Sequence, residues 1–225
     1  YLPPPSATGA LVLADGTVFW GQGAGAEGEA VGEVCFNTSI TCYQEIMTDP
    51  SYAGQVICFT FPHIGNVGAN SEDIETRSPV ARGCILRADI TEPSNWRSMQ
   101  HYDGWLKSHN LVALAGVDTR RLTRRIRNQG APQGLIMHNA NRKWDIPAAI
   151  EKAKVWPGLE GMDLAKEVSC TQSYEWMEAA WCRGKGYGSL TQPKHHVVAI
   201  DFGAKHNILR CLAALDCKVT LLPAT

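Results

Sequence analysis

The sequence predicts an α/β protein in two parts: a mixed β/α domain, then the first βαβ unit of a doubly wound, flavodoxin-like domain that is truncated. Segments rich in β-branched and aromatic residues alternate with helical patterns through the first part of the chain. Residues 170–194 then show no apolar period of either kind. Residues 196–222 follow with strand, loop, helix and strand, the order in which a doubly wound sheet begins.

The first domain opens with a predicted β-hairpin. Ala10–Leu13 and Val18–Gly21 flank Asp15 and Gly16, a pair typical of a tight hairpin turn. Runs of β-branched and aromatic residues between turn residues indicate further strands. These strands are expected at Val31–Phe36, Gln55–Phe61, Arg82–Ile90 and Gly134–Met137.

Two helices are predicted in the same domain. The first covers Asp118–Gln129, where the initial aspartate can cap the N-terminus and Gly130 can end the helix. Leu122 and Ile126 lie one turn apart and give this helix an apolar face. The second helix is expected near Ile146–Lys154.

The last part of the chain contains a glycine-rich segment followed by a strand–helix–strand pattern. The glycine-rich run Arg183–Ser189 lies in the second half of residues 170–194, and we interpret that half as an interdomain linker or exposed loop. A strand at His196–Ile200, a helix at Asn207–Leu215 and a strand at Val219–Leu222 follow it. These three elements make up the predicted βαβ unit.

We therefore divide the chain into a first domain at residues 1–165, a junction at 166–194 and the start of a second domain at 195–225. A doubly wound sheet needs more strands than the last segment supplies. The chain also begins at Tyr1 without a methionine and stops shortly after the last predicted strand. We expect it to be part of a longer protein.

Composition excludes several classes of partner. The net charge of −1 provides no long-range field for nucleic acid, and no apolar run is long enough to span a membrane. Arginines nevertheless crowd the first predicted helix, where a solvated face or contact with an acidic partner surface explains them better than nucleic acid. They are Arg120, Arg121, Arg124, Arg125 and Arg127.

The cysteines favour free thiols in a reducing, cytoplasmic setting. The chain has 8 cysteines, none in a C-x-x-C pair, and several lie inside apolar runs where cysteine behaves as a small hydrophobe. His195 and His196 have no third ligand nearby, so we expect no metal site. His63, in a glycine-rich loop, is better explained by a backbone hydrogen bond than by pairing with Cys42 or Cys58.

Several motifs in register resemble one family. The N-terminal motifs are Gly32–Ser39, Tyr43–Tyr52, Pro62–Gly68, Asp118–Arg120 and Pro157–Leu164. In this order they resemble the N-terminal domain of the carbamoyl-phosphate synthetase small subunit. Asp201–Leu209 then resembles the start of that subunit's class I glutamine amidotransferase domain. The resemblance covers nearly the whole chain from about Ala10, and is weakest over residues 170–194.

The resemblance implies a glutaminase reaction. The family's small subunit hydrolyses L-glutamine and passes ammonia to a large subunit, which uses ATP, Mg²⁺ and bicarbonate to make carbamoyl phosphate for pyrimidine and arginine synthesis. It implies a hetero-oligomer and no cofactor in this chain. The family's catalytic cysteine, histidine and glutamate lie later in the amidotransferase domain, so we expect the triad beyond Thr225 and no catalytic residue in this chain.

Two residues are candidates for contact with glutamine. Ser51 matches the serine with which the family's N-terminal domain touches the substrate, and its hydroxyl can donate and accept; the alternative is a plain Asp-Pro-Ser turn. Lys205, the second candidate, follows the first strand of the βαβ unit, where it can meet a substrate carboxylate, steady the domain junction or simply be solvated.

One residue departs from the family pattern. Cys42 stands where the family usually has glycine, so a positive φ at this site would strain its side chain by roughly 1 kcal/mol. That strain would affect the local geometry near Ser51.

Two other functions remain open on the sequence. A nucleotide-binding α/β protein is disfavoured because the loop Asp201–Lys205 lacks the glycine triplet of a pyrophosphate turn. A non-enzymatic module that only holds the large subunit is the other alternative. The genomic sequence downstream of Thr225 decides whether the chain is such a module, since a cysteine turn and a later His-x-Glu would exclude it.

Residues 1–225 alone should release no glutamate from glutamine, because no cysteine in this range has a predicted base and oxyanion cradle. A glutaminase assay on the purified chain checks this. Turnover that a single cysteine substitution abolishes would contradict it.

Overall fold

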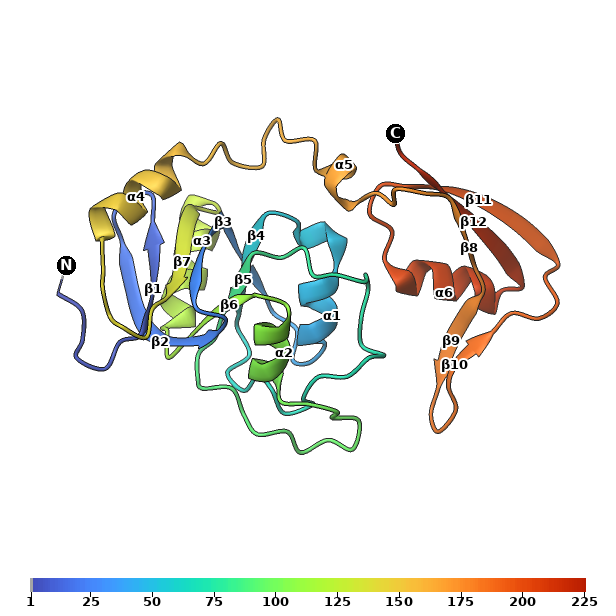
Figure 1. The fold of residues 1–225 in the computed structure, drawn as a ribbon, viewed down its shortest axis with the longest axis horizontal. Helices are drawn as coiled ribbons and strands as arrows, with labels where there is room; N and C mark the ends of the chain where they lie inside the picture. The colour runs from blue at the N-terminus through green and yellow to red at the C-terminus, as the bar shows by residue number, and fades with distance from the viewer. Residues whose placement is uncertain (1) are drawn as a thin grey trace.

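The computed structural model describes residues 2–225 as a large β-barrel followed by a smaller unit at the C-terminal end (Figure 1). A long connection over the top of the barrel joins the two, and the smaller unit lies on the side of the barrel that carries helix α1. The α/β class expected from the sequence is therefore confirmed.

Seven strands close the barrel in the order β1-β2-β6-β5-β4-β3-β7. Their bounds are β1 (Gly9–Leu13), β2 (Val18–Gly25), β3 (Gly28–Asn37), β4 (Gln55–Phe59), β5 (Gly83–Ile85), β6 (Val112–Ala115) and β7 (Gln133–His138). The pairs β3/β4, β4/β5 and β5/β6 are parallel, and the others are antiparallel. Strand β3 closes the barrel because its first half pairs with β7 and its second half with β4.

Alternation along the strands divides the apolar residues between two faces. Leu11 and Leu13 point to the interior core, while Ala10 and Val12 pack outward against a helix. Strand β4 behaves in the same way, with Val56 inside and its neighbours packed outside. The strands are therefore buried on both faces, which requires helices around the barrel.

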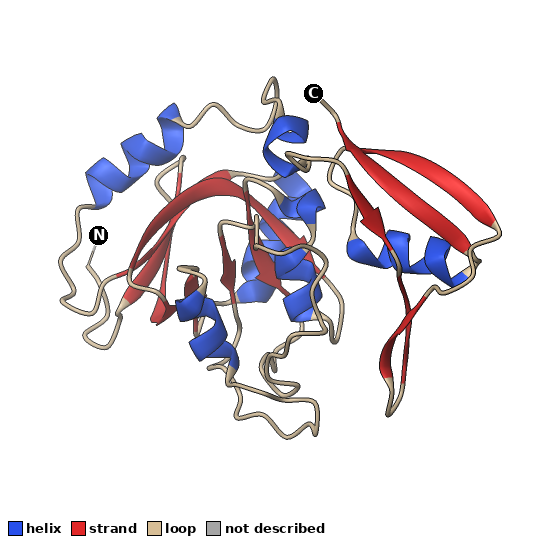
Figure 2. Cartoon of the chain, turned by 45° about the vertical axis from the view of Figure 1, so that its right-hand side comes forward, coloured by secondary structure: helices blue, strands red, loops and turns tan. Residues whose placement is uncertain are grey.

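Helices supply that cover (Figure 2). Helices α1 (Tyr43–Thr48) and α2 (Tyr102–Ser108) share one outer cluster, and α4 (Ile146–Val155) covers the β1–β7 side. Helix α3 (Thr119–Gln129) contributes Leu122 and Ile126 to the interior core.

Helix α3 confirms its predicted capping. The Asp118 carboxylate accepts a hydrogen bond from the Arg121 backbone N–H at 3.1 Å, and Gly130 ends the helix. The strand expected at Arg82–Ile90 is too long, since pairing in β5 ends at Ile85. Beyond Leu86 the chain leaves the sheet because polar residues replace the apolar ones.

The C-terminal unit contains the predicted strand–helix–strand order. Strands β11 (His195–Asp201) and β12 (Cys217–Pro223) are parallel, with α6 (His206–Ala214) between them in the chain. Leu209 of the helix packs on Val219 and Leu221. The expected βαβ unit is thus present, whereas the sheet described here, β11-β12-β8, does not show a doubly wound domain.

The second half of residues 170–194, expected as a linker or loop, differs from that expectation. It contains the end of β9 (Glu178–Cys182) and all of β10 (Gly186–Ser189), and it is preceded by α5 (Leu164–Val168) and β8 (Tyr174–Trp176). Strand β8 pairs with β12, because Tyr174 and Trp176 pack against its apolar cluster, and β9–β10 turn at Gly184 as a hairpin. Cross-strand aromatic packing gave structure to a segment without an apolar period.

Over residues 2–225, no helix combines the length and apolar character needed to cross a membrane. The same range contains no group of three or more side chains placed to hold a metal ion. All eight cysteines are free thiols.

Cys42 immediately precedes α1 and has a left-handed backbone with φ of 69°. The condition under which the Cys42 side chain is strained is therefore met. Its side chain provides no capping hydrogen bond for α1, so the strain is not offset by a cap.

Cys42→Gly should raise the free energy of unfolding by about 1 kcal/mol, because glycine adopts this φ without a Cβ clash. Urea unfolding of the two proteins measures the difference. Cys42→Ala is the matched control, since it keeps the Cβ and should give no such gain. Equal effects of glycine and alanine would contradict the backbone explanation.

Candidate functional site

Ser51 lies in a short 3₁₀ helix, η1 (Pro50–Tyr52), that follows α1 directly. Asp49 caps η1, since its Oδ1 accepts a hydrogen bond from the Ser51 backbone N–H at 2.9 Å. Ser51 itself is exposed. The turn expected in the simpler interpretation is present, and it leaves Ser51 exposed to solvent.

Lys205 ends the loop between β11 and α6. Its Nζ lies 2.6 Å from Oδ2 of Asp49, whose side chain is only 8% exposed, whereas Lys205 is 41% exposed. The hydrogen bond with Asp49 raises the pKa of Lys205, so the ammonium stays charged. Both oxygens of one carboxylate therefore join the two residues selected from the sequence, Ser51 and Lys205.

Asp49 is the residue that sequence reasoning missed. The signal was present in part, because an aspartate before Pro-Ser is a typical cap of a short turn. Its pairing with Lys205 has no local signal, since the two residues lie far apart in the chain. The ion pair favours the second interpretation of Lys205, that it steadies the junction. The remaining N–H donors of the ammonium can still bind a ligand.

The loop Asp201–Lys205 is folded on the side chain of its first residue. One oxygen of Asp201 accepts hydrogen bonds from Gly203 and Ala204, and the other accepts one from the Cys170 backbone N–H at 2.8 Å. Gly203 has φ of 89°, and a Cβ there would lie 2.7 Å from Val168 and 3.1 Å from Pro50. Only glycine allows the loop to approach η1 so closely.

A cleft of about 720 Å³ adjoins this contact, at the carboxyl end of β11 where open α/β sheets bind ligands. Its lining includes Pro50 from η1, Arg77 from the barrel, and Trp176 and His206 from the C-terminal unit. The rings of Trp176 and His206 pack with centroids 4.7 Å apart. Burial lowers the pKa of His206 to about 4, so this imidazole is neutral at pH 7.

Four cysteines of the described chain have thiol pKa values above the usual range for structural reasons. Cys170 lines the cleft, but burial and then the Asp201 carboxylate raise the pKa of its thiol. Burial in the barrel raises the pKa of Cys35, Cys58 and Cys84 to about 12. A nucleophilic cysteine needs the opposite shift.

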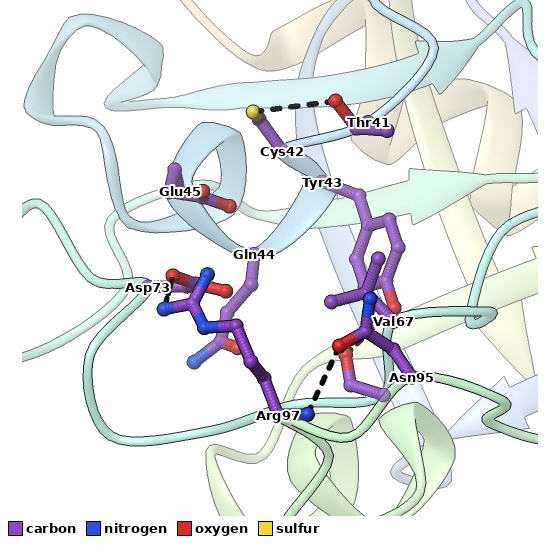
Figure 3. Close-up of a pocket in the computed structure, with 10 residues that line it drawn as sticks. Thr41, Cys42, Tyr43, Gln44, Glu45, Val67, Asp73, Asn95 and Arg97 are labelled. Carbon is purple, nitrogen blue, oxygen red and sulfur yellow. Dashed lines mark hydrogen bonds and ion pairs between the residues drawn. The ribbon is translucent and has the colours of Figure 1, made fainter. Parts of the chain in front are cut away.

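A smaller cavity of about 180 Å³ lies at the start of α1 (Figure 3). Arg97 lies across it and donates to Asp73 at 2.6 Å. Glu45, on the same wall as Cys42, has no cation of its own, and burial raises its pKa to about 7.

Ser51 and Lys205 line neither cavity, and neither do the histidines and the α3 arginines considered from the sequence. His63 is exposed with its ring edge-on to Phe61, and His196 meets Thr220 through its Nε2 at 2.8 Å. On α3, Arg125 pairs with Asp15 and Arg121 lies over the ring of Phe19. The remaining arginines, Arg120, Arg124 and Arg127, are exposed on the helix surface.

Comparison with known proteins identifies the family that the sequence motifs resemble. The family model described as "Carbamoyl-phosphate synthase small chain, CPSase domain" matches residues 11–136. Proteins named carbamoyl phosphate synthase small chain are similar over almost the whole chain. That of Ruegeria pomeroyi is 58% identical over 223 residues, that of Bradyrhizobium diazoefficiens 56% over 227, and that of Zymomonas mobilis 56% over 216.

These alignments include 99%, 99% and 96% of this chain. They include only 58%, 57% and 58% of the respective relatives. The chain therefore spans a little over half the length of the curated relatives it matches.

The buried carboxyl Glu45 should make stability depend on pH. Its pKa is raised from 4.5 to about 7 in the folded protein, so the folded state binds this proton more tightly than the unfolded chain. Its stabilising contribution is complete below pH 4.5 and is lost as pH rises to about 7. Glu45→Gln should therefore be more stable than the parent at pH 8, by roughly 2 kcal/mol.

Urea unfolding at intervals between about pH 5 and pH 8 measures this difference. The exposed Glu160→Gln is the matched control and should leave the pH profile of the parent unchanged. Parallel profiles for the parent and Glu45→Gln would show that Glu45 does not titrate in this range.

Proposed function

The chain belongs to the family of carbamoyl-phosphate synthase small chains, and from this premise we propose that it forms part of a glutamine-hydrolysing subunit. The complete subunit releases ammonia from glutamine. A large subunit then uses this ammonia, with bicarbonate and ATP, to make carbamoyl phosphate.

The observation that carries the proposal is the shared carboxylate of Asp49. It ties Ser51 of the barrel to Lys205 of the C-terminal unit, at the carboxyl end of a parallel strand pair. Glutamine presents an amide, an ammonium and a carboxylate. The exposed hydroxyl of Ser51 can donate and accept, and the ammonium of Lys205 has donors beyond the one used on Asp49.

Glutamine would thus bind where the two units meet. The barrel contributes Ser51 from the short, capped η1, so the hydroxyl sits on a rigid element, as precise binding requires. The C-terminal unit contributes Lys205. Neither unit would hold the substrate alone.

The C-terminal unit begins the amidotransferase domain in this proposal. Several of its large apolar side chains are exposed, including Val198 and Ile200 on β11 and Leu215 after α6, which is unfavourable unless other elements cover them. Further strands and helices of a doubly wound sheet would bury them. The catalytic cysteine, histidine and glutamate would lie on those elements, beyond Thr225.

The large subunit is the proposed partner. ATP and Mg²⁺ act there, so this chain needs no cofactor of its own. The exposed arginines of α3, Arg120, Arg124 and Arg127, provide a cationic surface for an acidic region of that partner. Arginine suits such a contact because its planar group binds carboxylates in pairs of hydrogen bonds.

Ser51→Ala in the complete enzyme should lower kcat/KM for glutamine by about 5- to 150-fold, which corresponds to 1–3 kcal/mol for an unpaired polar group of the substrate. Carbamoyl phosphate synthesis from added ammonia bypasses this contact and should barely change. Steady-state assays with each nitrogen source measure the contrast.

Ser94→Ala is the matched control, since Ser94 is exposed on a loop away from η1. It should leave both activities as they are. Equal losses with glutamine and ammonia in Ser51→Ala would assign a structural role to Ser51. Unchanged glutamine kinetics would remove Ser51 from the substrate site.

A further inference from the structure

Helix α6 starts without a cap from its own sequence. Lys205 occupies the N-cap position, and its side chain turns away to Asp49 and makes no capping hydrogen bond. The first backbone N–H groups of a helix have no partner within the helix and need acceptors from elsewhere. Here the acceptors come from the barrel.

Glu75, in the barrel loop between β4 and β5, supplies two of these acceptors. Its backbone carbonyl accepts a hydrogen bond from the His206 N–H at 3.0 Å, and its Oε2 accepts one from the Asn207 N–H at 2.8 Å. The carboxylate also lies at the positive end of the helix dipole, where a negative charge is favourable. A residue of one unit therefore performs the capping that α6 lacks.

The barrel holds Glu75 from its other side. The Glu75 backbone N–H donates to Oγ1 of Thr48 at 2.9 Å, and the Thr76 hydroxyl donates to the Thr48 carbonyl at 2.8 Å. Thr48 is 1% exposed and directly precedes Asp49. Since Asp49 binds Lys205, the contacts form a closed ring through Thr48, Glu75, the start of α6, Lys205 and Asp49.

We propose that Glu75 is a positioning residue for the glutamine site, acting through the start of α6 on Lys205. With two attachment points, one on each side of the first turn, the Lys205 ammonium keeps one position relative to Ser51. Without the Glu75 carboxylate, only the ion pair with Asp49 and the backbone hydrogen bond from His206 to Glu75 would hold this turn. The effect on glutamine binding rests on the proposed function. The capping of α6 by Glu75 rests on geometry alone.

Docking of the two units does not depend on Glu75 alone. Trp181 Nε1 donates to Oε2 of Glu72 at 2.8 Å, the Tyr187 hydroxyl donates to the Glu72 carbonyl at 2.9 Å, and Arg210 donates to the Ile74 carbonyl at 3.3 Å. These contacts survive a change at Glu75. The effect of such a change should therefore be local to the first turn of α6.

Amide hydrogen exchange tests the capping directly, on the complete small subunit with its large subunit. Glu75→Ala should speed exchange of the Asn207 amide by about tenfold, because the lost cap frees this N–H. Glu75→Gln keeps an acceptor oxygen and should restore most of the protection. Glu27→Ala, an exposed glutamate on the β2–β3 turn, is the matched control.

Glutamine kinetics on the same complexes test the positioning. Glu75→Ala should raise the KM for glutamine by about five- to tenfold, the effect of a lost cap, with little change in kcat or in ammonia-dependent synthesis. Glu75→Gln should give a KM for glutamine between those of the parent and Glu75→Ala. In the Glu75→Ala background, Lys205→Ala should raise the KM for glutamine by a smaller factor than it does in the parent enzyme. Both substitutions act on the same group, the Lys205 ammonium.

Unchanged Asn207 exchange in Glu75→Ala would overturn the capping, and additive effects with Lys205→Ala would overturn action through that lysine. Equal losses of glutamine- and ammonia-dependent synthesis would overturn the positioning role in favour of general structure. A parent enzyme without glutamine-dependent synthesis would overturn the proposed function and its glutamine part, while the exchange result would still decide the cap.

Discussion

The nearly buried carboxylate of Asp49 is the constraint on which the arrangement of the two units depends. A charge with 8% exposure is unfavourable unless it is paired, and its two oxygens receive the Lys205 ammonium and the Ser51 N–H. To deliver that lysine, the chain after β11 must pass within contact distance of η1. Gly203 is the residue that makes this approach possible.

Packing and hydrogen bonds within the barrel domain hold Asp49 in one position. Tyr43 and Met47 of α1 pack in the outer core, and the Tyr43 hydroxyl donates to the Gly68 carbonyl at 2.6 Å. The buried Gln44 amide exchanges two hydrogen bonds with the backbone of Asn70, at 2.6 and 2.9 Å. Helix α1 thus holds η1 on one side and the loop that carries Glu75 on the other, so one rigid element supports both attachments to α6.

Local signals explain which parts of the fold could be predicted from the sequence. The Asp15-Gly16 hairpin and the Asp118 cap of α3 depend on residues near each other in the chain, and both are present. The β11–α6–β12 order follows from apolar periodicity. Elements that depend on distant partners were missed or misjudged, among them the short β6 between β2 and β5 of the barrel and β8 beside β12.

The candidate site divides in the same way. Family motifs led to Ser51 and Lys205, and the departure from glycine at Cys42 pointed to a position that has a positive φ. Asp49 and Glu75 were not found, because their roles come from contacts between segments remote in sequence. Periodicity and composition do not indicate which distant residues will be in contact, because only the fold brings them together.

A crystal structure of the complete small subunit with bound glutamine would test the central claim most directly. The account predicts that Ser51 Oγ lies within hydrogen-bond distance of the ligand, roughly 2.6–3.2 Å, while Lys205 still binds Asp49 beside it. Glutamine bound without contact to Ser51, or a structure in which Asp49 and Lys205 are apart, would contradict it.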